Sequence, residues 1–133
     1  MSLPRLKAGA HALGLDLDDQ QLERLLAYLD LLAKWNRAYN LTAIRDREQM
    51  ISRHLFDSLS VLPHLHPGTL LDVGSGAGLP GIPLALADSR RSITVLDSNG
   101  KKTRFLEHVK LELDLEQVTV VRARVEEYLP VNP

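Results

Sequence analysis

The fold is decided by residues 70–83, which read Leu-Leu-Asp-Val-Gly-Ser-Gly-Ala-Gly-Leu-Pro-Gly-Ile-Pro. A short apolar run that ends near an acid is typical of a buried parallel strand, which we expect over residues 69–73. Glycines at 74, 76 and 78 then allow a turn with positive φ and bare backbone. A helix is predicted over residues 79–87, with free N–H groups directed back at the turn. Together these features predict a ligand site at the carboxyl end of the strand.

Two classes of cofactor compete for this turn. Residues 76–81 satisfy the dinucleotide pattern G-x-G-x-x-G, with Asp97 about 20 residues further on as the acid that binds a ribose. Asp72 lies just before the first glycine, where a carboxylate repels a pyrophosphate but attracts an ammonium group. The amino-acid end of S-adenosylmethionine carries an ammonium group, so Asp72 favours that cofactor over NAD. A turn that merely links a strand to a helix is the structural alternative.

Composition limits the class of protein. The 133 residues, 44% of them hydrophobic, predict one globular domain or one domain with an N-terminal extension. The absence of cysteine excludes disulfides, thiolate metal ligands and cysteine nucleophiles within the sequence. A net charge of −1 does not by itself indicate a nucleic-acid partner, although basic residues cluster in 34–53 and 101–124. Without a secretory signal or an apolar run of roughly 20 residues, we expect a cytoplasmic protein that does not span a membrane.

The front of the chain, residues 1–66, is predicted to be helical. A short helix is expected over residues 3–13, and Asp18 is expected to cap a long helix whose apolar stripe runs to Trp35. Asp46 is expected to cap a third helix over residues 47–65.

Histidines in this region suggest structural roles. His54 and Asp57 lie three residues apart on one helical face, where we interpret them as fastening the helix to the later half of the chain. General acid and base chemistry by this pair is the alternative. His64 and His66 have no third convergent ligand, so no metal site is predicted.

Alternating strands and helices are predicted for residues 67–133. Strands are expected over 92–97 and 118–122, in addition to the one over 69–73. Asp97 ends the second strand and is expected to accept both ribose hydroxyls. Its alternative role is to cap the following helix. After the third strand, Val125 is expected to provide an apolar wall for adenine and Glu126 a polar contact; alternatively, Glu126 simply begins an exposed helix.

Six motifs follow one another through nearly the whole chain. They read K-W-N at 34–36, Y-N-L-T at 39–42, R-H-L-x-D-S-L at 53–59, D-V-G-S-G-A-G-L-P-G-I-P at 72–83, L-D-S at 96–98 and R-V-E-E at 124–127. In this order they resemble the RsmG family, also called glucose-inhibited division protein B (GidB). The resemblance implies an α/β, Rossmann-like class I fold of S-adenosylmethionine-dependent methyltransferases with an N-terminal helical extension. It also implies methylation of guanine N7 in bacterial 16S ribosomal RNA.

The resemblance implies cofactor contacts at Gly74, Leu79, Val125 and Glu126. With the residues singled out above, the predicted cofactor site comprises Asp72, Gly74, Gly76, Gly78, Leu79, Asp97, Val125 and Glu126. Guanine N7 is an unprotonated lone pair, so its methylation requires alignment rather than a general base, and we name no catalytic residue.

Basic side chains are predicted to contact RNA phosphates, and we expect a monomer that binds the small ribosomal subunit. The predicted RNA contacts are Arg45, Arg53, Lys101, Arg104 and Arg124.

The family pattern continues into a fourth strand after the Glu-Glu pair, whereas this sequence ends at Pro133. In the expected strand order, 3-2-1, the strand over residues 69–73 is an uncovered apolar edge. We therefore expect either a chain truncated after the third strand or a partner chain that covers this edge. Besides the methyltransferase, two other functions stay open: an NAD-type oxidoreductase domain and a non-catalytic RNA or ribosome assembly factor.

Overall fold

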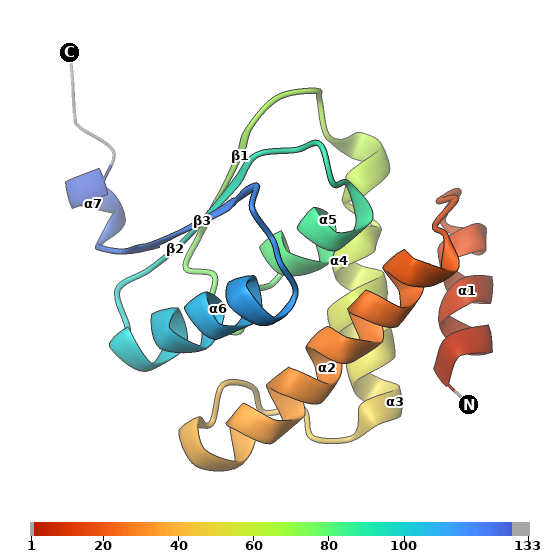
Figure 1. The fold of residues 1–133 in the computed structure, drawn as a ribbon, viewed down its shortest axis with the longest axis horizontal. Coiled ribbons are helices and arrows are strands. Elements are labelled where there is room, and N and C mark those ends of the chain that lie inside the picture. Colours follow the sequence, from red (N-terminus) through yellow and green to blue (C-terminus); the bar gives the residue numbers. More distant parts are fainter. Residues whose placement is uncertain (1, 129–133) are drawn as a thin grey trace.

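A computed structural model describes residues 2–128 and shows helices packed on a parallel sheet (Figure 1). Strands β1 (Leu70–Val73), β2 (Ile93–Asp97) and β3 (Val118–Arg122) lie in the order β1-β2-β3. The crossover helices α5 (Gly81–Ala87) and α6 (Gly100–Glu112) connect them. The predicted α/β fold, its strand order and the edge position of the first strand are confirmed.

Two helices form the beginning of the chain, α1 (Ser2–Ala12) and α2 (Asp19–Tyr39). Asp18 caps α2 as predicted, because its side chain accepts from the Gln21 N–H at 2.8 Å while Gln21 Oε1 accepts from the Asp18 N–H at 2.9 Å. Asn40 ends α2 in the left-handed conformation, with φ of 51°. No helix in residues 2–128 is long and apolar enough to cross a membrane.

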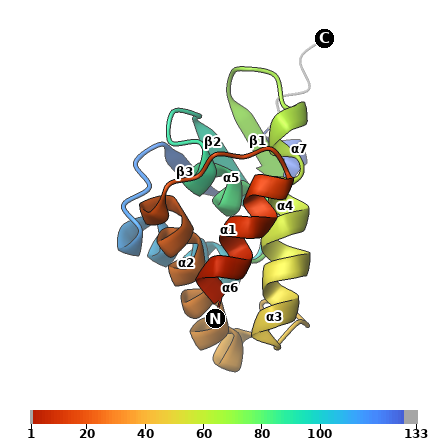
Figure 2. The same cartoon turned by 90° about the vertical axis from the view of Figure 1, so that its right-hand side faces the viewer.

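The third predicted helix is a composite of several short turns. After the cap at Asp46 come α3 (Arg47–Met50), a π-helical stretch (Ile51–Phe56), α4 (Asp57–Leu59) and a 3₁₀ turn (Leu62–His64). Figure 2 shows α1 beside this composite helix and against α2. The contact is close at Gly9, where an added Cβ would lie 2.1 Å from the Phe56 ring.

One hydrophobic core joins the helical front to the sheet. Buried side chains of α1 and α2, such as Leu6 and Leu29, belong to the same cluster as Val95 of β2 and Phe105 of α6. Because α2 packs on both α5 and α6, it covers the outer side of the two crossover helices. The boundary predicted between residues 66 and 67 stays a prediction, and the core extends across it.

The two faces of the sheet are covered unequally. Ile93, Val95 and Val118 are buried on the face under α5 and α6, which lie on the same side in Figure 1. On the other face, Val73 is 48% exposed and Thr119 is exposed. Within residues 2–128, β1 pairs only with β2, so the outer edge of β1 carries unpaired backbone groups.

Candidate cofactor cleft

A cavity opens where the three strands end. Its volume is about 440 Å³, within the range of sites that bind small molecules. Its position at the carboxyl edge of a parallel sheet is the one predicted from the sequence. The lining residues are Val73, Gly74, Leu96, Asp97, Ser98, Ala123, Arg124, Val125 and Glu126.

The glycine turn has one open side and one packed side. Gly74, Gly76 and Gly78 all have positive φ, of 68°, 58° and 96°. An added Cβ at Gly74 would meet nothing within 4 Å, whereas one at Gly78 would lie 2.6 Å from Ile82 Cγ1. The side of the turn at Gly74 therefore leaves room for a ligand to contact the backbone. The N–H of Gly74 donates to the Leu96 carbonyl at 2.8 Å, which holds the turn against β2.

Asp97 lies at the edge of the cavity and holds the glycine turn from the side of β2. Its Oδ2 accepts from the Gly76 N–H at 2.9 Å and its Oδ1 from the Asn99 N–H at 2.8 Å. Because each carboxylate oxygen accepts more than one hydrogen bond, Asp97 retains capacity for ligand hydroxyls. The alternative role as a helix cap is wrong, since Asn99 caps α6 by accepting from the N–H groups of Lys101 and Lys102.

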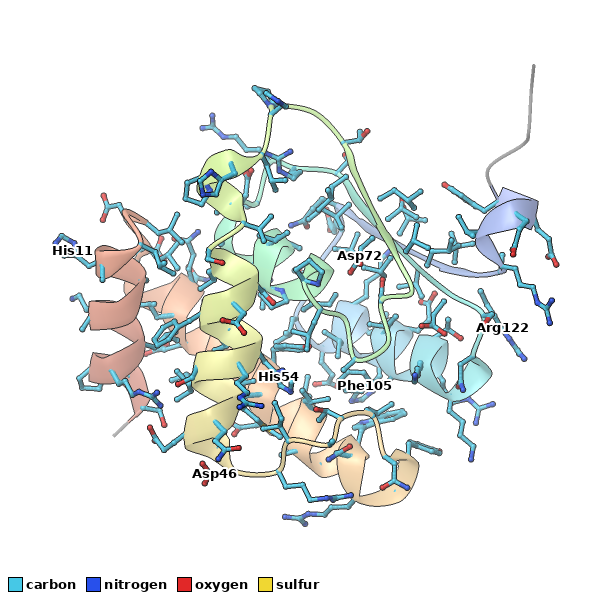
Figure 3. The ribbon with its side chains drawn as sticks, turned by 180° about the vertical axis from the view of Figure 1, so that it is seen from behind. His11, Asp46, His54, Asp72, Phe105 and Arg122 are labelled. Carbon is cyan, nitrogen blue, oxygen red and sulfur yellow. The ribbon has the colours of Figure 1, made fainter. Side chains whose placement is uncertain are left out.

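Asp72 lies behind the turn and is not among the residues that line the cavity. It is 8% exposed, and its Oδ2 accepts from the Gly81 N–H at 3.0 Å (Figure 3). Burial raises the pKa of the Asp72 carboxyl above its ordinary value of 3.8; the hydrogen bond from Gly81 opposes this shift, and the charge of Asp97 adds to it. Asp72 thus fastens the turn to α5, and its direct contact with a cofactor ammonium stays a prediction.

The beginning of α5 offers no free backbone donor. The Gly81 N–H donates to Asp72, and the Ile82 N–H donates to the Gly78 carbonyl at 2.7 Å. The prolines at 80 and 83 have no N–H at all. The expectation that this helix end presents N–H groups to a ligand carboxylate or phosphate is therefore wrong. The helix also begins at Gly81, two residues later than predicted.

Some of the other predicted cofactor residues line the cavity, and others lie on the packed side of the glycine turn. Val125 and Glu126 line the cavity from the short helix α7 (Val125–Tyr128), together with Gly74. Gly78 is buried and Leu79 packs against the core, with both N–H groups directed to the Ser75 carbonyl. Sequence reasoning missed Ser98 and Ala123 in the lining, although each neighbours a predicted residue at a strand end.

Comparison with known proteins gives the family. The family model for GidB, described as rRNA small subunit methyltransferase G, matches residues 21–133. The chain belongs to the GidB family. The resemblance inferred from the six motifs is thereby confirmed.

Proteins named ribosomal RNA small subunit methyltransferase G are similar along most of this chain. The protein from Pseudomonas entomophila (strain L48) is 60% identical over 130 residues, which are 96% of this chain and 60% of that protein. The protein from Ectopseudomonas mendocina (strain ymp) is 59% identical over 130 residues, covering 96% of this chain and 61% of that protein. The chain therefore spans about 60% of the length of these relatives.

In this GidB-family chain, helix α2 contacts the glycine turn through a buried hydrogen bond. The Tyr28 hydroxyl donates to the Ala77 carbonyl at 2.6 Å, and Tyr28 is fully buried. Burial raises the pKa of the Tyr28 phenol, so it stays protonated and remains a donor. Sequence reasoning missed this contact. The sequence feature that could have indicated this contact is a tyrosine within the apolar stripe of α2, because a buried phenol requires a hydrogen-bond partner.

His54, Thr42 and Asn36 form a hydrogen-bonded cluster, which we call the polar latch. His54 Nε2 lies 2.9 Å from Thr42 Oγ1, and the Thr42 N–H donates to Asn36 Oδ1 at 2.9 Å. Asp57 is exposed, so the hydrogen-bond partner of His54 is Thr42 rather than Asp57. Burial lowers the pKa of His54, with the charge of Asp57 opposing the shift. The latch holds the loop after α2 against the composite helix. His54 is labelled on that helix in Figure 3.

The five basic residues predicted to contact RNA are all exposed. Arg124 lines the cavity, and Arg104 lines a second hollow together with Arg122. Arg122 lies beside the first turn of α6 (Figure 3). Arg45 donates to Asn40 Oδ1 at 3.0 Å, and Arg53 is on the composite helix. Contact with RNA stays a prediction for all of them. Within residues 2–128, no three histidine or acidic side chains converge to hold a metal ion.

Proposed function

We propose that this chain binds S-adenosylmethionine and serves methylation of N7 of guanosine 527 in 16S ribosomal RNA. The observation that carries the proposal is the cavity in which Asp97 lies beside the open side of the glycine turn. The names of the relatives, all ribosomal RNA methyltransferases, support the substrate class.

The residues of the cavity fit an adenosyl group. Asp97 has acceptor capacity for the two ribose hydroxyls, and the open space at Gly74 admits a ligand against the backbone. Val125 offers an apolar wall and Glu126 a polar contact at the far side, where adenine would lie. S-adenosylmethionine would supply the methyl group there, while the chain aligns the reactants and excludes water.

The beginning of α5 argues against a dinucleotide. In dinucleotide-binding folds the pyrophosphate lies on the free N–H groups of the helix after the glycine turn. Here Asp72 accepts from the first N–H of α5, so a carboxylate occupies the position that a pyrophosphate requires. The same carboxylate is compatible with a ligand that carries an ammonium group. The NAD-type alternative is therefore the weaker proposal.

Binding of S-adenosylhomocysteine by isothermal titration calorimetry tests the cofactor. We expect the 133-residue chain to bind this demethylated form of the cofactor and to melt at a higher temperature in its presence, with no such effect from NADH. Asp97→Ala is expected to lower the affinity, and Asp57→Ala is the matched control because Asp57 is exposed on the composite helix. Binding of NADH without binding of S-adenosylhomocysteine would contradict the proposal.

Methyl transfer separates an enzyme from a non-catalytic ribosome factor. Labelled S-adenosylmethionine is incubated with small ribosomal subunits that lack the modification and with the chain. Label at guanine N7 supports the methyltransferase. Cofactor binding without transfer, while a relative of full length transfers label in parallel, would support a non-catalytic role for this chain.

A further inference from the structure

We propose that a surface at the end of α2 and on α6 stacks a nucleobase of single-stranded RNA. The class of ligand rests on the proposed function in RNA methylation, whereas the location rests on side-chain geometry. We call it the Tyr39 surface; it consists of Trp35, Tyr39, Arg45, Lys101, Arg104 and His108.

The aromatic part of the Tyr39 surface is a connected set of rings. The ring centroids of Trp35 and Tyr39 lie 5.5 Å apart, and those of Trp35 and His108 lie 4.9 Å apart. Phe105 is fully buried and lies 5.7 Å from Trp35, which anchors the set to the core. Trp35, Tyr39 and His108 are only half-buried. A set of rings that packs on the core and is partly exposed to solvent resembles a stacking platform for bases.

Cations flank these rings. Lys101 Nζ lies 5.9 Å from the centroid of the Tyr39 ring, and Arg104 is exposed one turn further along α6. Arg45 donates to the side chain of Asn40, the residue after Tyr39. None of these three cations forms an ion pair with another residue of the described range 2–128. Their charges are thus available to phosphates.

Two acidic residues of α6 lie near this surface: Glu112 Oε1 is 4.0 Å from His108 Nε2, and Glu107 lines the hollow that Arg104 also lines. Glu112 is the last residue of α6, away from Lys101 at the first turn. Because neither acid forms an ion pair with the three cations within residues 2–128, the aromatic faces and these cations favour a single-stranded nucleic acid over an apolar protein segment.

One end of the Tyr39 surface lies at the same edge of the sheet as the cavity. Helix α6 begins at Gly100, three residues after Asp97, so Lys101 lies at the same edge of the sheet as the cavity. Arg124 is a further basic residue, and it lines the cavity. An RNA strand on the Tyr39 surface would therefore lead a neighbouring nucleotide toward the site of methyl transfer.

Tryptophan fluorescence provides a direct measurement, because Trp35 is the one tryptophan of the chain. The chain is titrated with a short single-stranded oligoribonucleotide and, in parallel, with an abasic oligomer of equal length and charge. We expect the oligoribonucleotide to quench Trp35 and the abasic oligomer to bind more weakly with little quenching.

Substitutions separate stacking from charge. Tyr39→Leu is expected to weaken oligoribonucleotide binding by about 5- to 100-fold, as for the loss of one stacked base, without changing its salt dependence. Tyr39→Phe keeps the ring and is expected to bind like the unmodified chain. Lys101→Gln is expected to reduce the slope of log affinity against log salt by about 0.7. Phe56→Leu is the control, because Phe56 belongs to the composite helix, where its ring packs on Gly9 of α1.

Equal quenching by the intact and abasic oligomers would overturn the proposal, and so would equal affinity of Tyr39→Leu and Tyr39→Phe. The fluorescence comparison uses the unmodified chain, so it decides the question even if Tyr39→Leu does not fold. If S-adenosylhomocysteine does not bind, the cofactor proposal is wrong. The proposal of base stacking is tested separately, by these oligomer titrations. Absence of any oligoribonucleotide binding would reject the Tyr39 surface as an RNA site and leave a protein partner as its occupant.

Discussion

The back and the front of the glycine turn differ in packing although one motif encodes both. At the back, a Cβ on Gly81 would lie 2.7 Å from Val95 Cγ1 and 2.8 Å from Asp72 Oδ2. At the front, Gly74 faces open space and Asp97 lines the cavity. The comparison shows that the later part of the motif, at Gly81, packs within the fold, whereas its first glycine, Gly74, leaves space for a ligand.

Strand register explains why two similar aspartates lie on different sides of this division. Asp72 pairs with Val95 inside the sheet, on the face that α5 covers. The last pair of β1 joins Val73 to Leu96, so Asp97 extends one residue beyond the end of β1. One aspartate is thereby enclosed under a helix, and the other reaches the cavity.

Substitution of alanine for Gly78 or Gly74 is expected to give the largest difference in stability and in ligand affinity between the two sides of the turn. Gly78→Ala is expected to lower the free energy of unfolding by about 3 kcal/mol, because it adds overpacking against Ile82 and Leu106 to the strain of positive φ. Gly74→Ala adds only the strain, about 1 to 2 kcal/mol, but is expected to weaken binding of S-adenosylhomocysteine more. Urea unfolding and calorimetry measure the two quantities. Equal loss of stability in both variants would break the distinction between back and front.

Removal of each aspartate sharpens the comparison. Asp72→Ala leaves the Gly81 N–H without its acceptor in a buried place and is expected to cost about 1 to 2 kcal/mol of unfolding free energy. Asp97→Ala is expected to cost less than about 1 kcal/mol, because water replaces its partly exposed hydrogen bonds. Its affinity for S-adenosylhomocysteine is expected to fall about tenfold or more, as for a lost hydrogen bond to a charged group. If Asp72→Ala lost affinity alone and Asp97→Ala lost stability alone, the assignment of the two sides would be reversed.

The pH dependence of stability gives the smallest effect. The folded chain holds the Asp72 proton more tightly than the unfolded chain, because burial raises the pKa of this carboxyl above 3.8. As pH rises from 3.8 through the raised value, the unfolded chain releases its proton first, and the contribution of Asp72 to stability falls. Asp72→Asn is expected to lack this fall. Urea unfolding of both proteins across that interval measures the difference, and parallel curves would contradict the expected titration.

The sequence was sufficient for the features that depend on local pattern. The strands lie within one residue of the predicted ranges, and both Asp18 and Asp46 cap helices. Gly74, Asp97, Val125 and Glu126, which were predicted to bind the cofactor, line the cavity, and their binding of the cofactor stays a prediction.

Features that depend on tertiary packing could not be predicted in the same way. The hydrogen bond of Asp72 to Gly81 depends on how α5 docks, which no periodicity specifies. The partner of His54 is Thr42, because a π-helical stretch and the loop after α2 bring them together, whereas helical spacing alone suggested Asp57. Tyr28 and Ala77 are separated by 49 residues, and only the packed core makes them neighbours.

The phenol of Tyr28 also bears on any attempt to transplant the glycine turn. Grafting residues 67–128 onto another scaffold would leave the Ala77 carbonyl without its donor and would expose the surfaces of α5 and α6 that α2 now covers. A chimera that keeps the conformation of the glycine turn must therefore include α2 as well.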